Sequence, residues 1–189
     1  MSAGYEEQAA SLSALVAAAQ GGDRDSFGQI FDSFHLPVYR YALARLRSPA
    51  DAEDVAAETF VAAFRSLGNF AWRGAPFEGW LFRIARSKIV DLQRRRARDG
   101  PMTPIASVDP ALLPHTADAS GDVIAREDEA AMLAAIRTLS ADQQDVLGLR
   151  FFAGLSLAEA ATAMGRSPNA VKQLQFRAVS ALRQQMVDR

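Results

Sequence analysis

Four carboxylates gather in one short stretch of the chain, at Asp51, Glu53, Asp54 and Glu58. Ser48 and Pro49 precede them and predict the start of a helix. On that helix Asp51, Asp54 and Glu58 would lie within about 60° of one another. Acidic side chains in a first turn complement the helix dipole, but Glu58 lies two turns further in. The stretch therefore predicts either an ordinary helix start or an acidic docking face.

The same carboxylates could serve a metal or an acid–base site. An α-helical carboxylate metalloenzyme needs a second group of ligands, and the chain has no cysteine and only His35 and His115, in different segments. No nucleophile, histidine or glycine-rich loop accompanies the acids. The sequence therefore predicts no metal, no cofactor and no catalysis.

A second group of residues combines arginines with aromatic rings. Residues 83–98 hold seven basic residues against Asp91 alone, a local net charge of +6. Phe70, Trp72 and Phe77 precede this segment, and Trp80 borders its basic face. Aromatic rings beside a cationic surface stack on single-stranded bases or hold an unpaired base. A solvated basic helix is the alternative, but the combination favours a surface that opens DNA strands.

Helix boundaries are clearest near the C-terminus. Ser156 and Glu159 have the spacing of a capping box, and Gly165 predicts the end of that helix. Ser167 and Pro168 then predict the start of the next helix. Two helices joined by a short turn with a glycine are typical of a helix-turn-helix unit. A buried stripe is expected on the second helix at Val171, Leu174, Ala178 and Leu182.

The opposite face of this second helix has the side chains of a DNA reader. Asn and Gln suit adenine, Arg and Lys suit guanine or phosphate, and Phe suits the thymine methyl group. The residues concerned are Asn169, Lys172, Gln173, Phe176 and Arg177. An ordinary helical hairpin with a solvated basic face is the alternative, but the combined signals favour DNA binding.

Helices must position all three groups, because apolar residues recur almost everywhere at intervals of three to four residues rather than two. The sequence therefore predicts an all-α protein, with Pro37 breaking or bending the second helix. The expected helices are 11–20, 25–47, 49–67, 76–98, 122–139, 141–152, 157–164 and 168–186.

A change in composition divides these helices into two small domains. Four prolines fall between residues 99 and 121, which predicts a flexible linker over 99–125 between domains 1–98 and 126–189. Residues 99–122 hold four Asp and neither Lys nor Arg, so they predict either a solvated spacer or an acidic strand in a nucleic-acid channel. The smaller domain is near the size at which a single core is marginal, so a partner surface could help to hold it.

The overall charge excludes one class of nucleic-acid binder. The 189 residues include 21 Lys and Arg against 22 Asp and Glu, a net charge of −1, which argues against a uniformly basic coat protein. The N-terminus has no basic signal region, and no apolar run approaches the roughly 18 residues of a membrane span. The expected location is the cytoplasm, with no membrane insertion.

As a set, these motifs resemble the extracytoplasmic-function (ECF) sigma factors of bacterial RNA polymerase. Residues 48–60 are similar to the core of the family's region two, and residues 80–86 and 91–96 to its promoter-reading helix. Residues 154–159 and 170–177 are similar to region four. The resemblance covers about 10–98 and 126–186, in the family's order.

The resemblance implies a protein that directs core RNA polymerase to promoters and opens the minus-ten element. Docking on the clamp helices of the β′ subunit would use Asp51, Glu53, Asp54 and Glu58. Minus-ten DNA would be bound by Asn69, Phe70, Trp72, Arg73, Trp80, Arg83, Arg86 and Lys88. The minus-thirty-five element would be read by Arg166, Asn169, Lys172, Gln173, Phe176 and Arg177.

Further partners implied by the resemblance are the polymerase β flap and an inhibitory anti-sigma factor, and the linker would thread the polymerase. A free-standing helix-turn-helix repressor or activator is the competing interpretation. It explains residues 126–186 but leaves the acidic face and the arginine and aromatic residues of 1–98 without a use.

Overall fold

The computed structural model describes residues 2–72, 76–99, 132 and 134–187. The described residues form helices and contain no strand, which confirms the all-α prediction. Arg73 and residues 100–125 of the predicted linker lie outside the described residues, as does most of the helix predicted at 122–139, of which 134–138 are helical.

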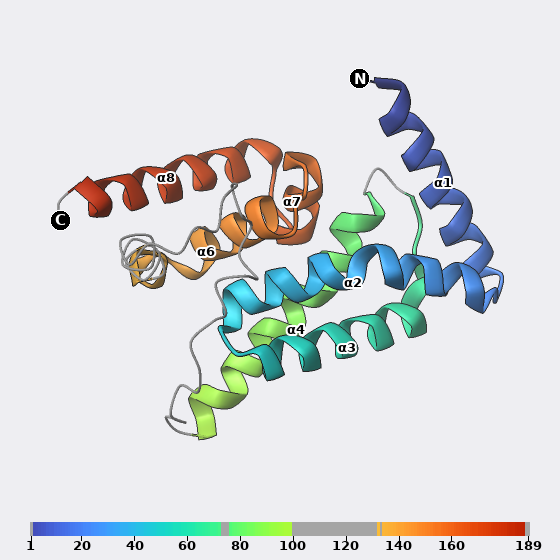
Figure 1. The fold of residues 1–189 in the computed structure, drawn as a ribbon, viewed down its shortest axis with the longest axis horizontal. Helices are drawn as coiled ribbons and strands as arrows, with labels where there is room; N and C mark the ends of the chain where they lie inside the picture. The colour runs from blue at the N-terminus through green and yellow to red at the C-terminus, as the bar shows by residue number, and fades with distance from the viewer. Residues whose placement is uncertain (1, 73–75, 100–131, 133, 188–189) are drawn as a thin grey trace, which may run out of the picture.

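The N-terminal unit consists of α1 (Ser2–Gln20), α2 (Arg24–Leu46), α3 (Pro49–Ser66) and α4 (Phe77–Asp99), with a short 3-10 helix η1 (Leu67–Asn69) after α3. Figure 1 shows α2 and α3 running antiparallel, with α4 crossing them. Phe77, Leu81 and Ile89 of α4 are fully buried. Burying a large apolar side chain of this kind is worth roughly 1.5–3 kcal/mol, so these contacts hold α4 in place.

Capping residues explain why these helices start where they do. The side chain of Asp23 accepts from the backbone N–H of Asp25, and that of Ser48 accepts from Asp51, immediately before Pro49. Of the two effects predicted for Pro37, a break or a bend, the break is wrong, because α2 continues through it to Leu46. Proline removes one backbone donor from the helix. Burial of Val38, Tyr41, Ala42 and Leu43 keeps the helix intact.

The C-terminal unit consists of α6 (Ala141–Leu147), a π-helical segment η3 (Gly148–Phe152), α7 (Leu157–Met164) and α8 (Pro168–Val187). Over 141–152 the predicted single α-helix is wrong in type, because its last five residues are π-helical. The predicted capping box is confirmed: Ser156 N donates to Glu159 at 2.7 Å and Glu159 N donates to Ser156 Oγ at 3.3 Å. Gly165 ends α7 in the left-handed conformation, with φ 63°.

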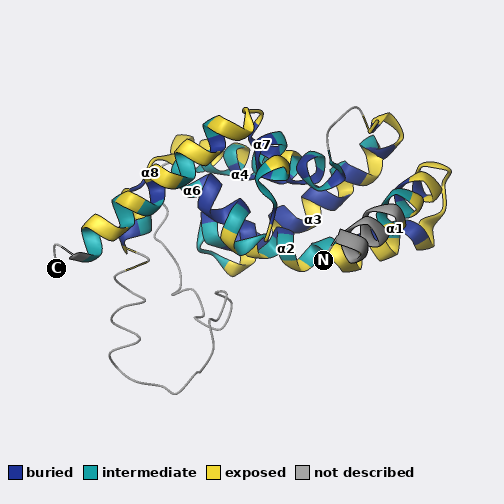
Figure 2. Cartoon of the chain, turned by 90° about the horizontal axis from the view of Figure 1, so that it is seen from above, coloured by how far each residue is buried: buried dark blue, intermediate teal, exposed yellow. Residues whose placement is uncertain are grey.

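The two units share one hydrophobic core, an arrangement that the sequence did not indicate. A Cβ on Gly79 of α4 would lie 2.5 Å from Thr162 Cβ of α7, and a Cβ on Gly148 would lie 2.8 Å from the Tyr41 ring of α2. Both glycines therefore permit backbones of the two units to approach closely. Figure 2 shows buried residues on helices of both units and exposed residues on their outer faces. Among the described helices, none has the length and apolarity to cross a bilayer.

Candidate nucleic-acid and protein interfaces

The four carboxylates of α3 have different environments. Asp54 is exposed, and Glu53 is exposed with its Oε1 3.5 Å from His35 Nε2. Asp51 is largely buried, and its Oδ1 accepts from Arg96 Nη2 of α4 at 2.6 Å. Glu58 Oε2 lies 3.2 Å from Lys88 Nζ, also on α4. The outer face of α3 is therefore acidic at Glu53, Asp54 and Glu58, while Asp51 ties α3 to α4.

Apolar side chains continue this acidic face toward the end of α3. Phe64 is 54% exposed and Val61 is exposed beside it on the helix. Phe64 packs edge-on against Phe27 of α2, with ring centroids 5.0 Å apart, and Phe31 packs against Phe60 at 4.7 Å. The Phe64 ring therefore contacts α2 on one side and solvent on the other. Its exposure next to charged groups is typical of a surface that binds another protein.

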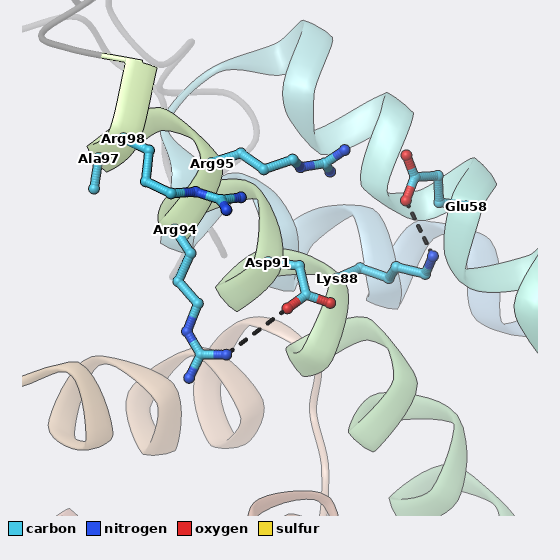
Figure 3. A pocket seen from close by; sticks show the side chains of 7 residues that line it. All are labelled: Glu58, Lys88, Asp91, Arg94, Arg95, Ala97 and Arg98. Atoms are coloured by element: carbon cyan, nitrogen blue, oxygen red, sulfur yellow. Dashed lines mark ion pairs between the residues drawn. The ribbon is translucent and has the colours of Figure 1, made fainter.

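A basic groove lies between α3 and the C-terminal half of α4. Its volume is about 600 Å³. The groove is lined by Glu58, Lys88, Asp91, Arg94, Arg95, Ala97 and Arg98. Figure 3 shows Lys88 reaching Glu58 and Arg94 facing Asp91, while the side chains of Arg95 and Arg98 extend into the same space. Exposed guanidiniums on one side of a helix can follow a phosphate backbone.

The predicted minus-ten aromatics form one cluster at the start of α4. Phe70 is only 8% exposed, and its ring centroid lies 5.1–5.5 Å from those of Trp72, Phe77 and Trp80. Gln20 of α1 holds this segment, because its Nε2 donates to the carbonyls of Leu67 and Phe70. Phe70 therefore forms the buried part of the cluster, against which the other three rings pack. Trp72 is 46% exposed and presents its ring at the surface.

Asn69 is exposed beside this cluster and Trp80 is half-buried within it. The structure thus brings Asn69, Trp72 and Trp80 together at one end of α4. Lys88 lies further along that helix, in the basic groove, next to Glu58. Arg83 and Arg86, which were predicted to bind DNA with them, face the C-terminal unit instead.

Arg83 and Arg86 contact the helix-turn-helix unit directly. Arg83 donates to the Thr162 carbonyl oxygen from Nε at 3.2 Å and from Nη2 at 2.9 Å. Arg86 Nε donates to Asp145 Oδ2 at 2.7 Å, and its Nη2 donates to Asp142 Oδ1 at 3.3 Å. Both arginines are therefore engaged by protein acceptors in this structure.

Asp145 of α6 is the centre of a buried network that sequence reasoning missed. Its Oδ1 accepts from Tyr41 Oη at 2.9 Å and from Arg45 Nε at 2.6 Å, both on α2, and its Oδ2 accepts from Arg86. The side chains of Asp145 and Arg45 are 2% and 3% exposed. Leaving one charge of such a buried pair without its partner typically costs about 3–5 kcal/mol.

Electrostatic effects follow from this network. Burial, together with the nearby Asp145 carboxylate, raises the pKa of Tyr41 well above its ordinary value, so its hydroxyl stays protonated and donates. Burial opposes the charge of Arg86, but the hydrogen bond and the charge of Asp145 outweigh it and raise the Arg86 pKa. No signal in the sequence of α6 distinguishes this buried aspartate from an exposed one.

The outer face of α8 is arranged as predicted. Asn169, Lys172, Gln173 and Arg177 are exposed, and Phe176 is 68% exposed. Val171 and Ala178 are fully buried on the other side, and Leu174 and Leu182 are partly buried against the core. Arg166, in the turn before α8, forms an ion pair with Asp142. The predicted reading surface is therefore one continuous exposed face, with Arg166 beside it.

The described residues contain no group of three or more His, Cys, Asp or Glu side chains arranged to share a metal ion. The carboxylates of the metalloenzyme alternative point instead to Arg96 and Lys88, or to solvent.

Comparison with known families identifies both units. A model described as Sigma-70 region 2 matches residues 30–99, and one described as Sigma-70, region 4 matches residues 135–184. These two modules in this order define a sigma factor, which is not a class of enzyme. The ECF RNA polymerase sigma factor BldN of Streptomyces coelicolor is 36% identical over 183 residues, which cover 97% of this chain and 69% of BldN. The chain belongs to the ECF RNA polymerase sigma factors.

Two solved structures have the same fold. CnrH, in complex with the cytosolic domain of CnrY, matches with a TM-score of 0.68 and 28% identity, covering 92% of this chain and 95% of CnrH. The sigma factor RpoE of Bartonella quintana, in complex with the anti-sigma factor NepR, matches with a TM-score of 0.65 and 26% identity, covering 86% and 98%.

Proposed function

We propose that this ECF sigma factor binds core RNA polymerase through α3, and that α4 and α8 bring the polymerase to promoters and open the minus-ten element. The observation that carries the proposal is the presence, in one chain, of an exposed acidic and apolar face on α3 and of two separate basic surfaces. A free-standing repressor needs only the α8 surface.

The polymerase partner proposed for α3 is the pair of clamp helices of the β′ subunit. Glu53, Asp54 and Glu58 supply negative charge, and Phe64 supplies exposed apolar area in the same face. Charge complementarity steers association, while burial of a central aromatic ring holds the complex together. Asp51 contributes by fixing α3 against Arg96. The C-terminal domain, residues 126–189, is proposed to contact the β flap.

The DNA contacts divide between the two units. In the N-terminal domain, residues 1–98, Trp72 offers an exposed ring for an unstacked base, and Asn69 and Trp80 lie beside it. Stacking of a base on an aromatic ring is worth roughly 1–3 kcal/mol, which is comparable to the cost of unpairing it. Lys88 and the groove arginines follow the strand backbone, and Arg83 and Arg86 of α4 join them when the C-terminal unit does not engage them. The minus-thirty-five element is read by α8 and the turn before it, through Arg166, Asn169, Lys172, Gln173, Phe176 and Arg177.

Control by an anti-sigma factor belongs to the same proposal, because the structural relative RpoE is bound to one. All of these partners act on transcription, so the protein is proposed to work in the cytoplasm.

Run-off transcription tests the proposal. Purified core polymerase is combined with the full chain and a library of genomic promoter fragments, and transcript start sites are mapped. Core polymerase alone and core with an Asp54→Lys chain are the controls. Promoter-specific starts that need the unaltered chain are expected. A chain that neither binds core nor initiates, but binds an operator tightly by itself, would be a free-standing regulator.

A further inference from the structure

The packing of the two units is incompatible with simultaneous reading of both promoter elements. The minus-ten and minus-thirty-five elements are separated by roughly 85 Å, for 25 base pairs at about 3.4 Å each. In this structure α4 and α7 are in direct contact, with Gly79 against Thr162. A helix the length of α8, 20 residues, spans only about 30 Å. The two units must separate before both elements are bound.

The contacts that close the units use two residues of the proposed minus-ten surface. Arg86 pairs with Asp145 and Asp142, and Arg83 donates twice to a carbonyl of α7. A carboxylate offers a guanidinium the same two-oxygen acceptor that a phosphate offers. In the closed structure, α6 therefore occupies donors that a DNA strand would use.

Asp142 contacts an arginine of each of the two proposed DNA surfaces. Its Oδ1 lies 3.3 Å from Arg86 Nη2, on the minus-ten side, and its Oδ2 pairs with Arg166, on the minus-thirty-five side. One carboxylate thus holds one arginine from each proposed DNA surface. About a third of its side chain is exposed, so a polyanion can compete with it from solvent.

We propose that Asp142 and Asp145 of α6 act as an internal substitute for DNA phosphate, which holds this sigma factor closed and lowers the affinity of the free chain for DNA. The proposal rests on the proposed function for its assignment of Arg86 and Arg166 to DNA. The segment that occupies the DNA-binding arginines is this chain's own α6, and no further protein is needed for closure.

Separation of the units is measured by energy transfer between two dyes. The chain contains no cysteine, so Ala57→Cys on α3 and Ser180→Cys on α8, both exposed, provide unique labelling positions. The DNA probe is a random-sequence 40-base-pair duplex, with binding measured by anisotropy. This duplex needs neither polymerase nor a known promoter.

The first variant is Asp142→Asn, which removes two partly exposed ion pairs. Its matched control is Asp32→Asn, which makes the same charge change at an exposed position of α2. Exposed pairs are individually weak, so we expect the Asp142 variant to bind the duplex roughly threefold to tenfold more tightly than the control and to show lower energy transfer. Asp145→Asn should act in the same direction, but it leaves Arg45 buried without its anion and could unfold the chain.

A steric variant removes no charge. Gly79→Ala places a Cβ 2.5 Å from Thr162 Cβ and 3.0 Å from the Glu159 carbonyl oxygen, so the units must move apart. Gly28→Ala in α2 meets nothing within 4 Å and is its control. We expect lower energy transfer and higher duplex affinity for Gly79→Ala alone.

Three results would overturn the proposal. Variants that match their controls in both measurements would show that α6 does not hold the two units together. Lower energy transfer without tighter duplex binding would show that α6 does not mask DNA-binding arginines. Tighter binding by Asp142→Asn with unchanged energy transfer would show that the lost negative charge, and not separation of the units, raises the affinity for DNA. None of these results depends on core polymerase, so core binding tests the proposed function separately.

Discussion

Lys88 Nζ of α4 lies 3.2 Å from Glu58 Oε2 of α3, and this ion pair joins the proposed DNA surface to the proposed polymerase surface. The two surfaces are therefore neighbours across one groove (Figure 3). A substitution at Glu58 alters the surroundings of Lys88 as well, so it cannot separate polymerase binding from DNA binding. Asp54 is exposed one turn earlier on α3 and is the cleaner position for testing the polymerase contact.

Asp54→Lys is expected to weaken binding to core polymerase by roughly tenfold or more, because it reverses a charge at the centre of the acidic face. Binding is measured by anisotropy of the labelled chain titrated with core. Asp32→Lys makes the same charge change at an exposed position of α2 and should bind normally. Equal affinity for the two variants would remove Asp54 from the interface. Urea unfolding should be unaffected in both.

Trp72→Ala and Phe70→Ala are expected to fail in different ways. Phe70 is a buried part of the aromatic cluster, so its truncation should lower the free energy of unfolding by about 3–5 kcal/mol. Trp72 is half-exposed, so its truncation should leave stability nearly unchanged but reduce opening of the minus-ten strand. Strand opening is followed with 2-aminopurine in the promoter, and stability by urea unfolding. Normal strand opening by Trp72→Ala would exclude it as the stacking residue.

Arg177→Ala is expected to weaken recognition of the minus-thirty-five element by roughly 1–3 kcal/mol if the arginine makes a bidentate base contact. Competition between promoters that differ in one base pair of that element measures this discrimination in the holoenzyme. Arg183→Ala removes the same charge from another exposed position of α8 and serves as the control. Equal losses on all sequences would make Arg177 a phosphate contact rather than a base reader.

Glu78→Gln is expected to change the pH dependence of stability. Burial, with a smaller contribution from nearby Glu159, raises the pKa of Glu78 above its ordinary value of 4.5. The folded state therefore holds this proton more tightly than the unfolded state, so the free energy of unfolding falls as pH rises from 4.5 through the raised pKa. The glutamine variant should gain stability over the parent at pH 7 and little at pH 4. Urea unfolding at both pH values checks this, and an identical difference at the two would contradict it.

Local signals in the sequence were sufficient for most of the fold. The capping box at Ser156, the glycine at 165 and the proline at 168 each act within a few residues, so the extents of α7 and α8 follow closely from them. The exposed face of α8 follows from the same helical periodicity. Pro37 is the exception, because tertiary burial outweighs its local effect.

Contacts between the units could not be predicted in this way. Asp145 and Tyr41 are 104 residues apart in the chain, and nothing in the short segment around either one indicates the other. Phe70 is another example, because an aromatic residue in a loop can serve equally as a core residue or as a base contact. Only its packing against Phe77 and Trp80 places it in the core. The sequence thus predicted which surfaces exist, but not that part of the α4 surface packs against α6 and α7.

Gly79 and Gly148 make the closed arrangement recognisable from two positions alone. Any larger residue at either site would meet Thr162 or the Tyr41 ring at less than 3 Å. Within an isolated helix, alanine is favoured over glycine by about 1 kcal/mol, so helix stability does not explain either glycine. In another sigma factor, a side chain at the equivalent of either glycine would signify a protein whose units pack differently or stand apart. The residue types at these two positions therefore indicate, from the amino-acid sequence of a relative alone, whether its two units can pack as they do here.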